Sequence, residues 1–211
     1  MLYSLGGTIL GARLVHCIFY DPTYYLSNPL AILRIWEGGL ASHGGVVGML
    51  LGLWLGHRTF EQSQSFLWLL DRAAIPAAFG AVLVRVANFL NSEIVGNPTS
   101  GNWGVVFDLI DQLPRHPVQL YEAGSYLLIG IFLLTVYRGF GKTTPHGLLF
   151  GGFMLLVFLA RIALECFKVP QAAYELGNAF SVGQYLSLPF VILGTILIIR
   201  SRKNWPQRTD Q

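Results

Sequence analysis

The residues with the clearest chemical potential form one polar stretch, residues 85–96, within an otherwise apolar part of the chain. An arginine, two asparagine amides and a carboxylate follow closely on the apolar residues 73–83. On insertion scales, an arginine near the centre of a bilayer costs about 2.5–3.5 kcal/mol, so a chain retains one where a partner or a ligand compensates for it. The side chains of this stretch that could bind or react are Arg85, Asn88, Asn91 and Glu93.

Spacing predicts which of these side chains share a surface. Arg85, Asn88 and Ser92 are separated by three and four residues, which places them on one face if the stretch is helical. Glu93 lies one step round from that face, and Gly96 would let the chain leave the helix. The alternative is a polar helix–helix contact followed by a helix end, with no ligand.

Three other apolar stretches also carry ionisable side chains. His43 is followed by two glycines, which would leave room for a ligand beside the imidazole, although a lone histidine is more often a hydrogen-bonded packing residue. Arg161 and Glu165 are four residues apart and could pair on one helix face, which would neutralise both within a bundle. The remaining stretch contains His116, Tyr121 and Glu122.

Together these residue types favour chemistry on a phosphate-containing lipid. Guanidinium groups bind phosphate in a bidentate manner, and two arginines are available. A histidine near neutral pKa can accept a proton from an attacking group. The chain has no Gly-x-Ser-x-Gly elbow, His-Glu-x-x-His pair or phosphate-binding loop, which argues against a serine hydrolase or a metalloprotease.

Composition defines the elements that must position these groups. Of the 211 residues, 53% are hydrophobic and only 12% are charged, against about 25% charged in soluble domains. We therefore expect an all-α polytopic membrane protein forming a single domain over residues 1–211, with about six spans. The net charge of +3 is too small to suggest nucleic acid as a partner. The expected spans are residues 1–20, 39–56, 66–90, 116–137, 147–167 and 184–199.

Two segments between the spans have distinct characters. Residues 21–38 are rich in aromatic residues and proline, which suits a segment lying at the membrane interface. Residues 93–115 carry turn signals and the β-branched run Val105-Val106-Phe107, so we expect a small extracytoplasmic cap with a short strand. In the first span, Gly6, Gly7 and Gly11 would permit close helix packing.

The distribution of basic residues predicts the orientation. Loops on one side of the expected bundle contain most of the lysines and arginines, and the positive-inside rule places that side in the cytoplasm. Both termini are then cytoplasmic, and the ionisable residues described above face the opposite leaflet. The basic residues on the cytoplasmic side are Arg58, Arg138, Lys142, Arg200, Arg202, Lys203 and Arg208.

Four blocks of this sequence resemble the bacterial prolipoprotein diacylglyceryl transferases. The blocks are residues 38–45, 85–96, 116–122 and 161–165, in the family's order, and together the resemblance covers essentially the whole chain. The second block fits the specific pattern Arg-x-x-Asn-Phe-x-Asn-x-Glu-x-x-Gly. The resemblance implies an enzyme of the bacterial inner membrane with its site open to the periplasmic leaflet. Such an enzyme moves the diacylglyceryl group of phosphatidylglycerol to the lipobox cysteine of preprolipoproteins.

The resemblance also implies residue roles. His43 resembles the proposed base for the incoming thiol, Arg85 and Arg161 the arginines that hold the lipid phosphate, and Glu165 a carboxylate that supports the second arginine. No metal or organic cofactor is implied, because the substrate supplies the thiol and fixed cations stabilise the leaving phosphate. The expected catalytic residues are His43, Arg85, Glu93, Arg161 and Glu165. The expected substrate-binding residues are Arg85, Asn88, Asn91, Gly96, His116, Tyr121 and Arg161.

The chain departs from the family pattern in two respects. It begins at what resembles the family's second span, so we expect that the family's first N-terminal span is absent from it. The tyrosine usual four residues before the second arginine is here Val157. Two alternatives to the transferase are a homologue that binds phospholipid or peptide without turnover and an ion-coupled transporter. The lack of an internal repeat disfavours the transporter.

Overall fold

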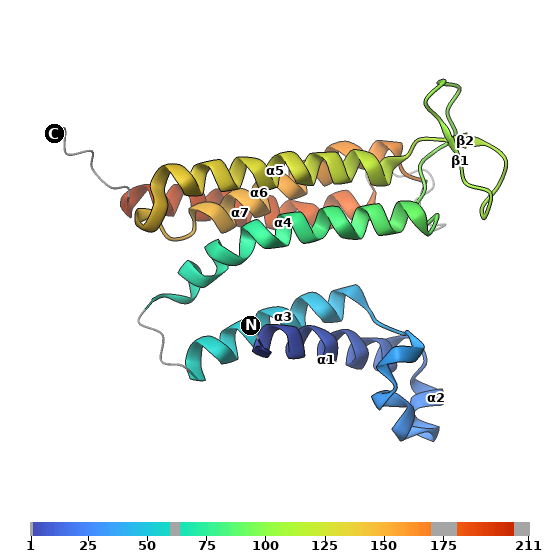
Figure 1. Ribbon diagram of the computed structural model, residues 1–211, viewed down its shortest axis with the longest axis horizontal. Helices are drawn as coiled ribbons and strands as arrows, with labels where there is room; N and C mark the ends of the chain where they lie inside the picture. The colour runs from blue at the N-terminus through green and yellow to red at the C-terminus, as the bar shows by residue number, and fades with distance from the viewer. Residues whose placement is uncertain (1, 60–63, 170–180, 205–211) are drawn as a thin grey trace. The chain divides into compact units, whose positions relative to one another are not determined.

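The computed structural model describes residues 2–59, 64–169 and 181–204, and its elements are almost all helices (Figure 1). The chain divides into two compact units, Met1–Leu69 and Leu70–Gln211. The all-α architecture expected from the composition is confirmed.

The first unit is built on a pair of helices, α1 (Leu2–Phe19) and α3 (Ser42–Thr59). They pack through glycines, because a β-carbon on Gly7 or Gly11 would overlap backbone atoms of Gly44 or Gly48 on α3. Glycines spaced four residues apart form a continuous strip along a helix, which lets two backbones approach closely. The expected close packing is confirmed for Gly7 and Gly11, whereas nothing lies within 4 Å of a β-carbon built on Gly6.

A buried arginine organises the segment between these two helices. Arg13 is 3% exposed, and its guanidinium donates hydrogen bonds to five backbone carbonyls. Its Nε lies 2.9 Å from the carbonyl oxygen of Ile32, and one Nη lies 3.0 Å from that of Arg34. Carbonyls in a segment without regular pairing need such donors, because a buried unpaired polar group is costly. The segment comprises α2 (Pro22–Ser27), η1 (Pro29–Leu33) and η2 (Ile35–Glu37).

The segment held by Arg13 has the exposed apolar surface expected of an interfacial element. Leu26, Leu30, Leu33 and Trp36 are all at least 70% exposed. Pro22 and Pro29 begin α2 and η1, as suits a residue that has no backbone N–H to donate. The exposed apolar side chains are those that an interfacial segment would place in the membrane, and the interfacial position of residues 21–38 stays a prediction.

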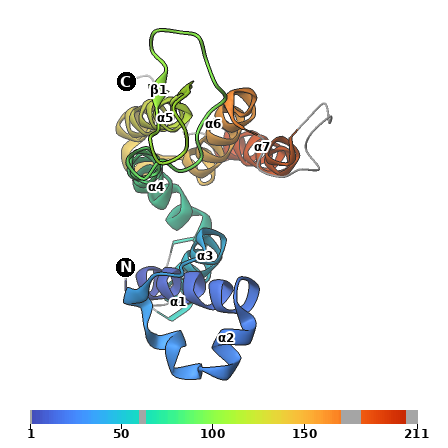
Figure 2. The same cartoon turned by 90° about the vertical axis from the view of Figure 1, so that its right-hand side faces the viewer.

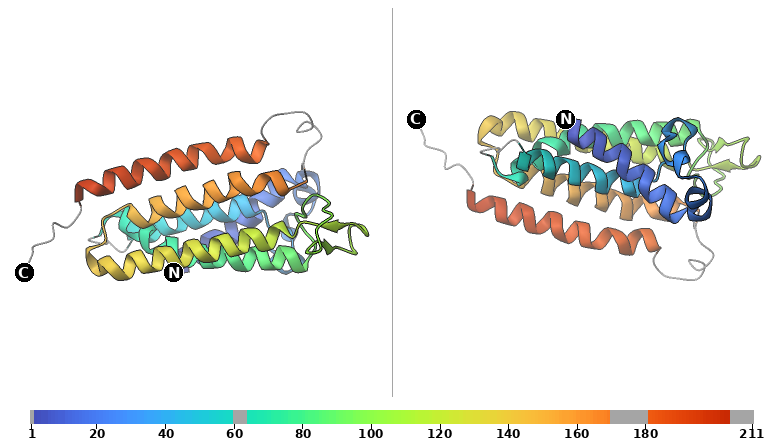
Figure 3. Two further views of the ribbon diagram at one scale, coloured as in Figure 1. Left: turned by 90° about the horizontal axis from the view of Figure 1, so that it is seen from above. Right: turned by 90° about the horizontal axis from the view of Figure 1, so that it is seen from below.

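The second unit is a bundle of four long helices (Figures 2 and 3). Helix α6 lies between α5 and α7 and contacts both (Figure 3). Glycines again allow the closest approach, since a β-carbon on Gly151 of α6 would lie 2.9 Å from the carbonyl oxygen of Gly194 on α7. The helices are α4 (Phe66–Leu90), α5 (Val118–Phe140), α6 (Leu148–Leu164) and α7 (Val182–Ser201).

The apolar core of this unit forms chiefly between α5 and α6. Tyr126, Ile129 and Leu133 of α5 pack with Leu149 and Val157 of α6, and all five are at most 9% exposed. Phe79 of α4 contacts Gly130, whose missing side chain makes room for the ring. Short 3-10 helices extend these elements at η3 (Gly141–Thr143), η4 (Glu165–Phe167) and η6 (Arg202–Asn204).

An aspartate fixes the start of α6. The Asp71 carboxylate is fully buried and accepts hydrogen bonds from the backbone nitrogens of Gly147 at 2.6 Å and Phe150 at 2.8 Å. A carboxylate is stabilised there because the first N–H groups of a helix lack partners within the helix and carry positive partial charge. This contact joins α4 to α6 at the end of the bundle opposite Arg161.

Five helices are long and apolar enough to cross a membrane, namely α1, α4, α5, α6 and α7. The expectation of about six spans included α3, which forms an 18-residue helix but is not among these five. Its five glycines, two histidines and one arginine make it less apolar than the others. The chain is thus a multi-pass membrane protein by the length and composition of its helices.

The only strands in the described part of the chain form a small hairpin at one end of the second unit (Figure 1). Strand β1 (Val105–Val106) pairs antiparallel with β2 (Pro114–Arg115), with Val105 opposite Arg115. The predicted short strand is confirmed at its first two residues. Phe107 lies just outside it and packs edge-on against Phe89 at the end of α4.

The glycine packing gives a matched test with neighbouring residues. Gly7→Ala should destabilise the protein by about 1–3 kcal/mol or more, because the new methyl group meets the backbone of α3 and not a movable side chain. Gly6→Ala should be neutral or slightly stabilising, since its methyl group meets nothing and alanine favours helix. Thermal unfolding in detergent measures both. Equal loss in the two variants would contradict close packing at Gly7.

Candidate functional site

A buried ion pair joins α4 to α5. The Nε of Arg85 lies 3.1 Å from Oε2 of Glu122, whose side chain is 1% exposed. One Nη of Arg85 also donates to Oδ1 of Asn88 at 3.3 Å. Arg85 therefore has the partner that an arginine in an apolar helix requires. Since Glu122 lies at Nε and Asn88 at one Nη, an anionic ligand would have to approach the other Nη.

The polar stretch leaves the helix after Leu90 and forms a tight turn. Helix α4 ends at Leu90, and Ser92 and Ile94 have φ angles of 57° and 54°. The prediction that Ser92 shares a helix face with Arg85 and Asn88 is therefore wrong for Ser92. Left-handed conformations are unfavourable for an isoleucine, so the surrounding contacts must hold this turn in place.

Asparagine side chains bind the carboxylate within this turn. Asn88 Nδ2 donates to Oε2 of Glu93 at 2.6 Å, and Asn91 Nδ2 donates to Oε1 at 3.4 Å. Gln119, which is 1% exposed, donates to the backbone carbonyl of Glu93 at 2.6 Å. Asn88 thus connects Arg85 to Glu93. The structure brings together four residues that the sequence analysis selected: Arg85, Asn88, Asn91 and Glu93.

Gly96 allows three segments to meet. A β-carbon there would overlap the backbone carbonyl of His116 and lie 2.6 Å from Cγ2 of Val118. Gly96 also forms a β-bridge with Lys168, and Asn97 accepts a backbone hydrogen bond from His116 at 3.0 Å. The expectation that Gly96 ends the helix is wrong, because α4 ends six residues earlier. Its lack of a side chain is needed for close packing instead.

Lys168 joins two carboxylates and is itself 7% exposed in its side chain. Its Nζ lies 2.9 Å from Oε1 of Glu122 and 3.1 Å from Oε2 of Glu165. The other oxygen of Glu165 accepts a hydrogen bond from Ser181 Oγ at 3.1 Å. The cations reach both Glu122 oxygens at ion-pair distance, without the alignment of a hydrogen bond.

The predicted Arg161–Glu165 pair is absent from the described part of the chain, where Glu165 binds Lys168 and Ser181. Arg161 is half-buried in the last turn of α6, and its buried Nε has no hydrogen-bond partner there. An unsatisfied buried donor on a cation is costly, and an anionic ligand would remove that cost. Tyr126 follows Glu122 by one turn on the same face of α5 and is 3% exposed.

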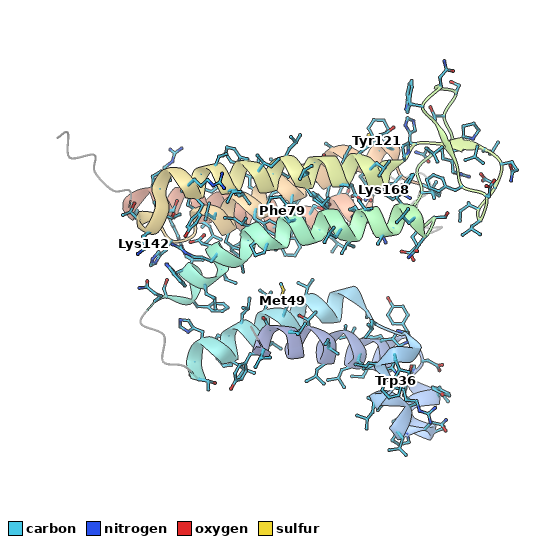
Figure 4. All side chains as sticks on the ribbon, viewed as in Figure 1. Trp36, Met49, Phe79, Tyr121, Lys142 and Lys168 are labelled. Carbon is cyan, nitrogen blue, oxygen red and sulfur yellow. The ribbon has the colours of Figure 1, made fainter. Side chains whose placement is uncertain are left out.

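The two histidines of interest differ in how far the structure describes them. His116 Nδ1 lies 3.3 Å from the hydroxyl of Tyr121, and its ring packs 5.1 Å from that of Phe167. Tyr121 and Lys168 lie at the end of the bundle that carries the hairpin, and Lys142 at the other end (Figure 4). His43 is the second residue of α3 in the first unit, and its side chain lies outside the described residues.

The hairpin is tied to the site loop by Arg115. Its Nη1 donates to the backbone carbonyl of Gly96 at 3.0 Å, and its Nε donates to Oδ1 of Asp111 at 3.1 Å. The hydrogen bond from Arg115 holds the pKa of the Asp111 carboxyl below its usual range. The same contact raises the pKa of Arg115.

Four contributors were not selected from the sequence as site residues. Gln119, Glu122 and Tyr126 are spaced three and four residues apart on α5, which is a recognisable one-face pattern in an apolar helix. Lys168 gives no such signal, because its role depends on the β-bridge to Gly96. Among the residues that the structure describes, no group of three histidine, cysteine or carboxylate side chains could hold a metal ion.

The fold and the site define a class of protein: a multi-pass membrane protein with a buried, cation-rich polar cluster at one end of its helices. Residues 1–200 match the family model described as prolipoprotein diacylglyceryl transferase. The chain therefore belongs to the prolipoprotein diacylglyceryl transferase family, which is a family of enzymes.

Curated relatives agree with this assignment. The chain is 56% identical over 203 residues to the phosphatidylglycerol–prolipoprotein diacylglyceryl transferase of Tolumonas auensis, covering 96% of this chain and 78% of that protein. It is 49% identical over 201 residues to the protein of the same name from Chloroherpeton thalassium, covering 95% and 75%. For that of Porphyromonas gingivalis the identity is 42%, covering 96% and 76%.

The Asp111–Arg115 contact predicts how the hairpin responds to pH. Because the folded-state pKa of Asp111 is lowered, the stabilisation is fully present above the ordinary aspartate value of about 3.9. It is lost as the pH falls through the lower folded-state value. Amide hydrogen exchange in residues 105–115, corrected for intrinsic rates, should therefore be constant from pH 8 to 5 and faster near pH 3.

Two substitutions separate this contact from a general acid effect. Asp111→Asn should show fast hairpin exchange already at pH 7, with little further change on acidification. Asp108→Asn is the control, because Asp108 accepts only from the exposed Gln112 amide among the described contacts. Slow exchange in Asp111→Asn at pH 7 would mean that the ion pair does not hold the hairpin.

Proposed function

We propose that this chain transfers the diacylglyceryl group of phosphatidylglycerol to the lipobox cysteine thiol of preprolipoproteins, the first step of bacterial lipoprotein maturation. The proposal places the protein in the bacterial inner membrane, with its site toward the periplasmic leaflet. The names of the relatives contain phosphatidylglycerol and prolipoprotein, which supports both substrates. The positive-inside rule supports the orientation.

The observation that carries the proposal is the pair of arginines at one end of the second unit. Arg161 has a buried Nε without a hydrogen-bond partner among the described residues, and Nε of Arg85 lies 3.1 Å from Glu122. An anionic group would therefore bind Nε of Arg161 and the Nη side of Arg85. A lipid phosphate carries several acceptor oxygens on one negative centre, which suits two such groups.

The reaction in this proposal exchanges one bond for another. The cysteine sulfur attacks the glyceryl carbon that carries the phosphate ester, and a carbon–sulfur bond forms as the carbon–oxygen bond breaks. The electron pair of the broken bond remains on the departing glycerol phosphate, where Arg85 and Arg161 stabilise the developing charge. The thiol proton passes to a base, for which His43 is the proposed residue.

The polar turn supplies rigidity in this scheme. Asn88 binds both Arg85 and Glu93, so the guanidinium is restrained on two sides. His116 and Tyr121 contact each other at the start of α5 and would orient the substrate. Fixed donors stabilise charge better than mobile ones because they need not reorganise during the reaction.

A direct assay tests the proposal. The purified chain is mixed with phosphatidylglycerol and a lipobox peptide, and mass spectrometry follows the gain of a diacylglyceryl group on the peptide. A peptide with serine in place of cysteine is the control and should remain unmodified. Binding of phosphatidylglycerol without transfer would favour the alternative, a homologue that binds lipid without turnover.

Arginine-to-lysine substitutions test the phosphate contacts. Arg85→Lys and Arg161→Lys should each reduce kcat by about 10²–10³-fold, the usual effect of removing one donor to a developing anion. Lysine keeps the charge but loses the planar fork. Arg138→Lys, at an exposed position in the last turn of α5, should retain full activity. Near-normal turnover in both site variants would exclude a phosphate clamp.

Substitution of His43 tests the base. A free thiol has a pKa near 8.5, so only a few per cent is thiolate at pH 7, and base catalysis contributes typically about 10²–10⁴-fold. His43→Asn should bind phosphatidylglycerol and lose most transfer at neutral pH. Its activity should recover partly as the pH rises, because solvent then supplies the thiolate. Normal turnover in His43→Asn with loss in His116→Asn would assign the base to His116.

A further inference from the structure

Lys168 has no place in the transfer scheme above, although its position is as restrained as that of any site residue. We propose that Lys168 is a positioning residue that keeps Glu165 away from Arg161, so that the Arg161 guanidinium stays available for the anionic lipid headgroup. The inference rests on the proposed function and adds a control element to the same site.

Both oxygens of the Glu165 carboxylate have partners. One carboxylate oxygen is held by Lys168 Nζ at 3.1 Å and the other by Ser181 Oγ at 3.1 Å. A β-carbon on Gly183 would overlap this carboxylate, so the start of α7 also closes in on it. Both oxygens of Glu165 are therefore directed away from α6 and toward the residues that follow it.

Arg161 lies one helical turn before Glu165. The backbone N–H of Glu165 bonds to the carbonyl of Arg161, so the two residues have helical i, i+4 geometry. On a helix this spacing brings side chains within reach, with β-carbons about 5–6 Å apart. Arg161 is thus the cation that Glu165 would meet if its contact with Lys168 were lost.

The balance of charges shows what Lys168 contributes. Arg85 and Lys168 bind Glu122, and Lys168 also binds Glu165. Two cations thereby serve two carboxylates, and Arg161 is left with no carboxylate among the described residues. Without Lys168, Glu122 would remain paired with Arg85, and Glu165 would be neutralised by pairing with Arg161. The site would then contain two closed ion pairs, and an incoming phosphate would have to displace a carboxylate from Arg161.

The backbone keeps Lys168 in place for this role. It bridges to Gly96, and the amide of Asn97 bonds to the carbonyl of Phe167 at 2.8 Å. The Asn97 side-chain amide adds a bond to the carbonyl of Cys166 at 3.2 Å. The turn that carries Glu93 therefore also positions Lys168, which couples the two ends of the charge cluster.

The test is a pair of substitutions whose effects should oppose each other. Lys168→Met should raise the KM for phosphatidylglycerol at least tenfold, with a smaller change in kcat, because lipid must compete with Glu165. Adding Glu165→Gln to Lys168→Met should lower that KM at least threefold, since the competing charge is removed. Lys142→Met, at the other end of the bundle (Figure 4), is the matched control and should leave KM unchanged.

Several outcomes would overturn the inference. If Lys168 had only a structural role, the double variant Lys168→Met/Glu165→Gln would lose as much activity as the two single substitutions combined. Both kcat and KM would then be impaired. A KM in Lys168→Met equal to that of Lys142→Met would exclude any role in lipid binding. Lys168→Arg should retain a near-normal KM, because arginine can also bind two carboxylates. If Lys168→Met fails to fold, Lys168→Gln and the double variant allow the same comparison.

A binding measurement separates this inference from the proposed function. If the unsubstituted chain transfers nothing, the proposed function fails, and equilibrium binding of short-chain phosphatidylglycerol in detergent replaces KM as the readout. The same order of affinities is expected: unsubstituted chain, then double variant, then Lys168→Met. If transfer occurs but the affinities do not follow this order, the proposed role of Lys168 is wrong and the proposed function is unaffected.

Discussion

Glu122 is a carboxylate with no solvent exposure in the second turn of the apolar helix α5, and the rest of the site depends on its neutralisation. Removing a charge from water costs several kcal/mol unless cations and hydrogen bonds replace the lost solvation. Arg85 and Lys168 provide those cations from opposite directions in the sequence. One buried charge thus requires α4, α5 and the segment after α6 to meet at one point.

This requirement explains the shape of the polar turn. For Lys168 to reach Glu122, its backbone must approach residue 96 closely, and only glycine leaves space beside the carbonyl of His116. Left-handed φ angles at Ser92 and Ile94 bring the chain to that position. The left-handed turn at Ser92 and Ile94 and the close packing at Gly96 therefore have one cause. Three segments converge there on a buried ion cluster.

Opposite ends of the second unit use polar residues in different ways. At one end both oxygens of the Asp71 carboxylate accept hydrogen bonds from backbone N–H groups at the start of α6. At the other end, near the end of the same helix, Nε of Arg161 has no hydrogen-bond partner within the described ranges. A rigid helix anchored at its first turn can hold a guanidinium at its last turn without a carboxylate partner, a suitable arrangement for binding a lipid phosphate.

From the sequence alone it was possible to predict the class of fold, the helix positions, the short strand at residue 105 and most of the polar residues that meet. Apolar length and the unusual charges in apolar segments are local properties, and they can be read without knowing the fold. Which charged side chains pair with one another depended on the tertiary structure. Helical spacing predicted that Glu165 would pair with Arg161, whereas in the structure Glu165 pairs with Lys168. Ser92 lies in the turn after α4 and not on its face. Those outcomes depend on which distant segments approach one another, because a buried carboxylate binds the cation that the fold brings nearest.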